Sequence, residues 1–151
     1  MRMKEDLYNT CLAIAIKAHL GQFRHDGKTP YIKHPIEVAG MFDDWIFKAK
    51  AILHDAIEDG GDNGVDKHYI LSELHKADKD SLFGAEIIDI VWAVVMLSRK
   101  KDEHYLDYVK GLWVHSLERF KIADITCNLA DSPSDSQKRK YKKAMKILLT
   151  P

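Results

Sequence analysis

The chain has 151 residues, and its composition excludes several functional classes. Hydrophobic residues make up 46% of it, enough for one domain to bury a core without disulfides or repeats. Lysine plus arginine number 23, as do aspartate plus glutamate, so no overall positive field exists to hold nucleic acid or an anionic membrane. We therefore expect one compact domain over residues 1–151, with neither nucleic acid nor membrane as partner.

The N-terminal segment and the cysteines predict a cytoplasmic protein. Residues 1–6 are charged and Lys17 interrupts the apolar stretch 11–18, which is typical of neither a signal peptide nor a membrane span. Cys11 and Cys127 lie in separate apolar stretches, where free thiols in a reducing compartment are expected.

Helical periodicity dominates the first sixty residues. Apolar residues recur at helical spacing over 7–18 and Gly21 supplies a stop, which predicts an amphipathic helix. Residues 22–34 are polar, contain glycine and proline, and predict a loop. A short helix is expected to begin at Pro35, and another near 47–58.

The remainder of the chain also predicts helices. Residues 70–74 indicate a modest helix after a glycine-rich break, and the strongly apolar 87–97 a largely buried, central one. The β-branched run within 87–97 also suits a strand, but its length and the lack of a partner strand favour helix. Further helices are expected at 102–113, 116–130 and 134–149. The predicted fold is all-α.

A His-Asp pair is the first candidate for chemistry. His54 and Asp55 lie in the predicted helix 47–58 among apolar neighbours, and buried polar groups need partners. A divalent cation would satisfy a neutral imidazole and a carboxylate together. His34 and Asp124, also in apolar settings, complete a candidate set of metal ligands that leaves positions for water and phosphate.

Polar residues at helical spacing surround these candidates. Glu58 and Asp59 follow Asp55 by one helical turn and are candidate proton acceptors for an attacking water. One face of the predicted helix 116–130 and its end can hold metal and substrate together. It comprises Lys121, Asp124, Asn128 and Asp131.

Each residue also has an ordinary structural explanation. His-Asp dipeptides are common, His34 can be a loop histidine, Asp124 can pair with Lys121, and Glu58-Asp59 can be a solvated helix end. The histidines in polar surroundings are given no role; they are His68, His75, His104 and His115.

Several motifs together are more specific than any one of them. They are AHLGQFR at 18–24, TPYIKHP at 29–35, ILHDAIED at 52–59 and KIAD at 121–124. In this order and spacing they resemble the HD hydrolase domain of the RelA/SpoT family, in the single-domain form of the small alarmone hydrolases. The resemblance covers about residues 7–131, with 134–149 as a C-terminal helix, and implies a compact HD-domain helical fold with no synthetase domain.

The resemblance implies a specific reaction. A manganese ion would be held by the two histidines and two aspartates named above, with Glu58 and Asp59 serving the attacking water. The 3′-pyrophosphate of guanosine tetra- or pentaphosphate would be removed, giving GDP or GTP and pyrophosphate. Iron, magnesium or zinc also suit mixed imidazole and carboxylate ligands.

Substrate contacts follow less completely from the resemblance. Arg24 matches an arginine that stacks on or brackets guanine, and Asn128 an asparagine that contacts the nucleotide. His25 stands where the family usually has a basic residue, with Lys28 as a candidate to compensate. Gly60-Gly61 replaces the usual threonine and is expected to loosen the end of the catalytic helix.

The sequence also allows two alternative functions. One keeps the site and changes the substrate to NADPH or another nucleotide with a 2′- or 3′-phosphate. The other is a nucleotide-binding protein without turnover.

Overall fold

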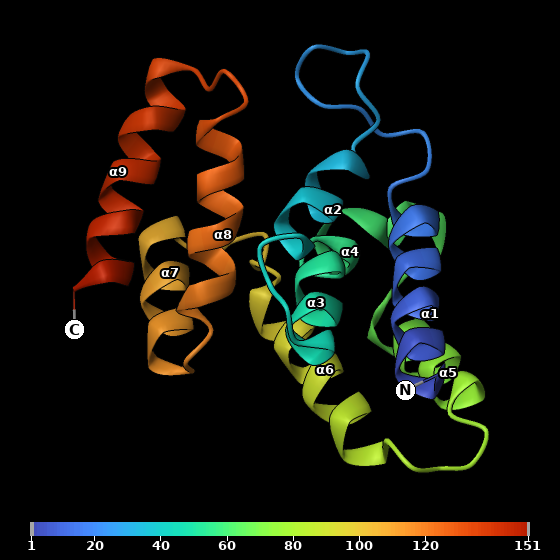
Figure 1. Ribbon diagram of the computed structural model, residues 1–151. Helices are drawn as coiled ribbons and strands as arrows, with labels where there is room; N and C mark the ends of the chain where they lie inside the picture. Colours follow the sequence, from blue (N-terminus) through green and yellow to red (C-terminus); the bar gives the residue numbers. More distant parts are fainter. Residues whose placement is uncertain (1, 151) are drawn as a thin grey trace. The chain divides into compact units, whose positions relative to one another are not determined.

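A computed structural model describes residues 2–150, and their regular secondary structure is helical (Figure 1). The all-α prediction is therefore confirmed. The chain divides into two compact units, Met1–Ser98 and Arg99–Pro151. The single-domain prediction stays a prediction, and its end residues 1 and 151 lie outside the described residues. Within 2–150 no helix combines the length and apolar character needed to cross a membrane.

The first unit is built on α1, which packs against α3, α4 and α5. Its buried residues recur at three- and four-residue spacing, as the sequence predicted, and include the free thiol Cys11. Left-handed Gly21 (φ 79°) follows soon after the helix ends. The helices of this unit are α1 Arg2–Ala18, α2 Lys33–Ala39, α3 Trp45–Ile52, α4 Ala56–Gly60, the 3-10 turn η1 Gly61–Asn63, α5 Lys67–Ala77 and α6 Gly84–Leu97.

The helix predicted at 47–58 is two helices separated by a turn. Leu53 and Asp55 have φ of −96° and −101° with ψ near zero, a conformation that ends the α-helical ladder. Hydrogen bonds tighten there to three-residue spacing, from His54 N to Ala51 O (3.3 Å) and from Ala56 N to Leu53 O (2.9 Å). His54 and Asp55 therefore project from a turn between α3 and α4. The sequence pattern did not predict this turn, because no glycine or proline marks the break between the two helices.

The apolar segment at 87–97 is helical, as predicted, within α6. Its buried residues lie on one face and include Ile87, Ile90 and Val94. Ile88 and Trp92 are 63% and 44% exposed, so the expectation of burial over most of the segment was too broad.

The second unit consists of three helices that pack pairwise (Figure 1, orange to red). They are α7 Tyr105–Val114, α8 Glu118–Leu129 and α9 Asp135–Leu149. Ser134 begins α9 with a capping box, in which its side chain accepts from Gln137 N and Gln137 accepts from Ser134 N. All three helices match sequence predictions to within a few residues.

The end of α1 lies close against the end of α4. A Cβ placed on Gly60 would come within 2.7 Å of Ala18 Cβ and 3.1 Å of Val65 Cβ. The Asn63 amide donates to the carbonyl oxygens of Ala18 (2.9 Å) and Leu20 (3.1 Å). The expectation that Gly60-Gly61 loosens this end is therefore wrong, because Gly60 permits close packing of two helices.

This packing predicts opposite outcomes for two neighbouring glycines. Gly60→Ala should lower the free energy of unfolding by about 1–3 kcal/mol, because the new methyl group overlaps backbone and Cβ atoms. Gly61→Ala is the matched control: a Cβ there meets nothing within 4 Å, and stability should hold or rise by about 0.5 kcal/mol. Urea unfolding of both variants checks this, and equal effects would contradict the close approach.

Candidate metal centre

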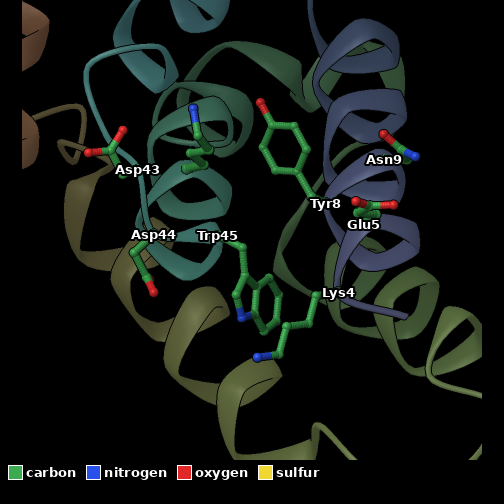
Figure 2. A pocket seen from close by; sticks show the side chains of 8 residues that line it. Lys4, Glu5, Tyr8, Asn9, Asp43, Asp44 and Trp45 are labelled. Carbon is green, nitrogen blue, oxygen red and sulfur yellow. The ribbon is translucent and has the colours of Figure 1, made fainter. Parts of the chain in front are cut away.

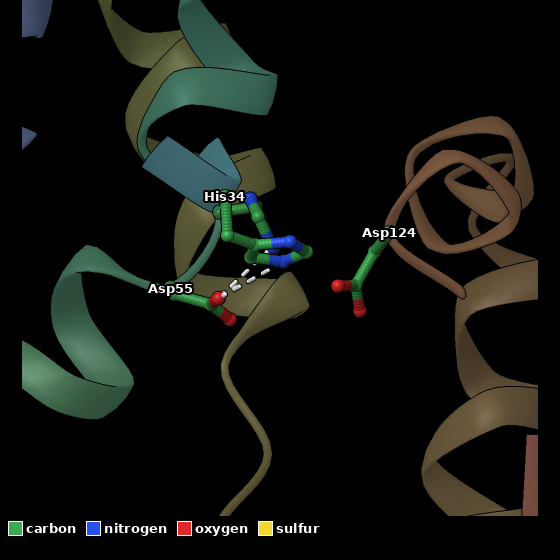
Figure 3. A group of neighbouring side chains, drawn as sticks. His34, Asp55 and Asp124 are labelled. Atoms are coloured by element: carbon green, nitrogen blue, oxygen red, sulfur yellow. Dashed lines mark ion pairs between the residues drawn. The ribbon is translucent and has the colours of Figure 1, made fainter. Parts of the chain in front are cut away.

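Three of the predicted ligands gather in the first unit. His34 is the second residue of α2, and His54 and Asp55 occupy the turn after α3. All three are buried, and each offers a ligand atom within 4.8 Å of the others. Asp55 Oδ2 lies 3.0 Å from His54 Nε2 and 3.8 Å from His34 Nε2 (Figure 3, dashed lines). Two imidazoles thus converge on one carboxylate oxygen.

The protonation of His54 shows what this cluster requires. His54 Nδ1 lies 2.7 Å from the carbonyl oxygen of Ala51, which can only accept, so Nδ1 carries the hydrogen. In the neutral ring Nε2 then has a lone pair that faces Asp55 Oδ2, another acceptor. Either a proton on one of these atoms or a cation bound by both would satisfy the contact, and a divalent metal suits a buried group of imidazoles and a carboxylate. The residues present therefore fit a metal ion.

Tyr31 belongs to this centre, although the sequence assigned it no role. Its hydroxyl donates a 2.6 Å hydrogen bond to Asp55 Oδ2. Its ring packs between His19 and His34, with centroid separations of 4.7 and 5.8 Å. Hydrogen bonds of this kind orient the carboxylates that bind metals. The available signal was its position three residues before His34 in TPYIKHP.

The acidic pair lies beside the same carboxylate. Asp55, Glu58 and Asp59 offer oxygens within 4.8 Å of one another, with Glu58 exposed and Asp59 half-buried on α4. Burial, followed by the charges of Asp55 and Glu58, raises the pKa of Asp59 to about 7. A carboxyl group of this pKa can accept a proton near neutral pH.

Asp124, labelled in Figure 3, belongs to the second unit and is buried on α8. Its Oδ2 accepts from Lys121 Nζ (2.7 Å) and its Oδ1 from Asn128 Nδ2 (3.0 Å), so these three share a helix face. The pair with Lys121, which the sequence suggested as an ordinary structural explanation for Asp124, is therefore present. Burial opposes the Lys121 charge, but Asp124, Tyr108 and Tyr105 outweigh it and hold the pKa of Lys121 well above its usual value. Asp131 follows the end of α8.

The other predicted substrate residues lie in the loop between α1 and α2. An antiparallel bridge between Phe23 and Pro30 closes the loop, with Arg24 N donating to Thr29 O (2.8 Å). The Arg24 guanidinium lies 5.3 Å from the Tyr31 ring centre. The exposed residues between the bridge positions include His25 and Lys28.

Asp26 orders this loop, which the sequence described only as polar. Its carboxylate accepts from Lys28 N, Thr29 N and the Thr29 hydroxyl. The Thr29 side-chain bond, then the two backbone bonds, lowers the pKa of Asp26 to about 2.

A separate hollow of about 600 Å³ lies elsewhere in the first unit (Figure 2). Two of its charged groups serve the fold: Asp44 caps α3, and Lys48 Nζ donates to Ala39 O. None of the predicted site residues lines it. The lining residues are Lys4, Glu5, Tyr8, Asn9, Asp43, Asp44, Trp45 and Lys48.

The histidines that were given no role are exposed, as expected from their polar surroundings. They are His68, His75, His104 and His115.

Comparisons with known proteins identify a distant relative. The chain is 31% identical over 98 residues to a Myxococcus xanthus protein named GTP pyrophosphokinase. The match covers 62% of this chain, which spans only 11% of the length of that relative. No family model matches the chain.

The raised pKa of Asp59 predicts a pH-dependent stability of the metal-free protein. A carboxyl group whose pKa rises on folding favours folding when protonated, and this contribution is lost as pH rises from about 4 through about 7. With chelator present, the wild type should lose about 1–2 kcal/mol relative to Asp59→Asn between pH 4 and pH 8, after allowance for solvent screening.

Urea unfolding at each pH measures this difference. Asp62→Asn, at an exposed position on η1, is the matched control and should follow the wild type. Parallel pH curves for wild type and Asp59→Asn would contradict the prediction.

Proposed function

We propose that this chain is a manganese-dependent phosphohydrolase that removes the 3′-pyrophosphate from guanosine tetra- or pentaphosphate, with Asp124 as fourth ligand. The observation that carries the proposal is the convergence of His34 and His54 on Asp55 with the acidic pair beside it. Two imidazoles with carboxylates can form a hydrolytic metal site, and the nearby acids can supply the proton acceptor that water requires.

The family assignment is part of this proposal. The motifs resemble the RelA/SpoT family, and GTP pyrophosphokinase is a name used within that family. That name describes transfer of pyrophosphate, whereas hydrolysis rests on the cluster around Asp55. A cytoplasmic location stays a prediction from the sequence.

The residues of the first unit divide the chemistry between them. When bound, a divalent cation supplies Lewis-acid stabilisation of the phosphorus oxygens. Glu58 and Asp59, whose oxygens lie within 4.8 Å of an Asp55 oxygen, are proposed to accept a proton from the attacking water. The water oxygen forms a bond to phosphorus, the bond from phosphorus to the ribose 3′ oxygen breaks, and that oxygen leaves as a hydroxyl after gaining a proton. Tyr31 holds the Asp55 carboxylate throughout.

Asp124 is proposed as a ligand on the chemistry of its own surroundings. Lys121 donates to one of its oxygens and Asn128 to the other, and a carboxylate oxygen has lone pairs for more than one partner, so the same carboxylate can also bind a metal. Lys121 and Asn128 orient the carboxylate as outer-shell partners do. Asp131 is proposed to contact the substrate near them.

The part of the site that binds the nucleotide is proposed to lie along the 23–30 loop. Arg24 can stack its flat cation on guanine while its neighbour Tyr31 reaches Asp55. Lys28 and His25 are candidates for contacts to the phosphates. Because the net charge of the chain is zero, such local cations must neutralise the substrate.

Product analysis tests the proposal. Purified protein with Mn²⁺ should release pyrophosphate and GDP from guanosine tetraphosphate, and His54→Asn and Asp55→Asn should each lower kcat by about 1000-fold or more. Chelator should abolish turnover reversibly. His68→Asn, at an exposed position on α5, is the matched control and should keep full activity.

Circular dichroism must show that the inactive variants remain helical. Release of orthophosphate alone would refute the assignment. So would tight nucleotide binding without turnover in manganese, iron, magnesium and zinc, which would identify a binding protein instead.

The exposed His25, where the family usually has a basic residue, favours one second candidate: a phosphatase for NADPH or a similar nucleotide. We expect kcat/KM to favour guanosine tetraphosphate over NADPH at least tenfold, because specificity is a ratio of these constants. His25→Lys should raise kcat/KM for the tetraphosphate several-fold by adding a fixed charge, whereas His25→Gln should change it little. A preference for NADPH in the wild type would select the second candidate.

A further inference from the structure

His19 is a buried polar residue that no role yet explains. It follows the last residue of α1 and is 3% exposed. Its ring packs on Tyr31, but it is outside the set of ligand atoms that gather around Asp55. Its Nε2 is buried with no hydrogen-bond partner among the described residues. Burial of such a nitrogen is unfavourable, so packing alone is a poor reason for a histidine here.

The other ring nitrogen makes a defined hydrogen bond to Gln22. His19 Nδ1 lies 2.9 Å from Gln22 Oε1. The Gln22 amide nitrogen donates to two carbonyl oxygens, those of Ala18 (3.2 Å) and Asp59 (2.7 Å), which fixes the orientation of the amide. Gln22 Oε1 must therefore accept, and His19 Nδ1 must carry the hydrogen. Burial lowers the pKa of His19, which agrees with a neutral ring.

The bond from Gln22 ends on one of the two candidate proton acceptors. The Asp59 carbonyl accepts from the Gln22 side chain, and Asp59 N donates to Asp55 O (2.9 Å). The main chain of Asp59 is thus held on both sides, by the metal-ligand turn and by Gln22 in the loop after α1. A rotation of the Gln22 amide would release the second of these.

We propose that His19 is a positioning residue: through Nδ1–H it sets the Gln22 amide, which holds the Asp59 main chain and so fixes the acidic pair beside Asp55. The effect of His19 on catalysis rests on the proposed hydrolytic function, whereas its effect on the position of the α4 main chain does not. Misplacement of a catalytic group by about 1 Å can lower the rate about 100-fold. Loss of the bond should therefore lower kcat about 10- to 100-fold with KM nearly unchanged.

Two isosteric substitutions separate the two nitrogens. In His19→Asn the amide nitrogen can take the place of Nδ1 and keep the donor to Gln22. In His19→Gln the longer amide reaches the place of Nε2 and the Nδ1 donor is lost. We expect His19→Asn to keep kcat within about threefold and His19→Gln to show the full loss. Gln22→Glu, which cannot donate to Asp59, should match His19→Gln, and the double variant should be no worse than either.

Measurements on the metal-free protein test the same bond without substrate. Nitrogen NMR of the His19 ring should show hydrogen on Nδ1. Hydrogen exchange of the Asp59 amide should accelerate about tenfold or more in His19→Gln and remain near wild type in His19→Asn. An Nε2–H ring, or equal behaviour of the two variants in exchange, would overturn the proposal. If exchange behaves as expected but wild-type protein releases no pyrophosphate, the proposed function fails and the positioning role stands.

Discussion

The hydrogen bond between His54 Nδ1 and the Ala51 carbonyl, 2.7 Å long, is the constraint on which the candidate centre depends. It exists because the chain leaves the α-helical ladder at Leu53, so that the ring of His54 folds back over its own turn. With Nδ1 committed to Ala51, Nε2 is the ring nitrogen that faces Asp55. A local interruption of one helix thereby turns His54 Nε2 toward Asp55, and His34 on α2 adds a second imidazole that faces the same carboxylate oxygen.

The polar groups around this turn are held by bonds from distant parts of the first unit. Tyr31, just before α2, donates to Asp55, and Gln22, in the loop after α1, donates to the Asp59 backbone. Gly60 lets α1 and α4 approach closely enough for the bond from Gln22 to Asp59, because any side chain at position 60 would meet Ala18. Stability and site geometry are therefore coupled at this contact. The same close packing that buries apolar surface also fixes the backbone of the proposed proton acceptor.

Electrostatics separate the roles of the carboxylates. Asp59 gains a raised pKa from burial and from its acidic neighbours, whereas Asp26 in the exposed loop has its pKa lowered by three hydrogen bonds. The first can exchange protons near neutral pH, while the second stays charged and orders a turn. In the second unit Asp124 is held by a lysine that its carboxylate keeps protonated. Identical side chains thus serve catalysis, loop order and metal binding in the proposed enzyme according to their surroundings.

Much of the fold and the candidate ligands followed from the sequence alone, because helical periodicity and a His-Asp pair among apolar residues are local signals. The helices predicted from α5 to α9 needed only small changes of boundary. Tertiary structure decided the turn at 53–55 and the contacts of Tyr31, Gln22 and His19. The bonds from Tyr31 to Asp55 and from Gln22 to Asp59 join residues 24 and 37 positions apart. Such partners depend on how helices pack, which no local pattern encodes.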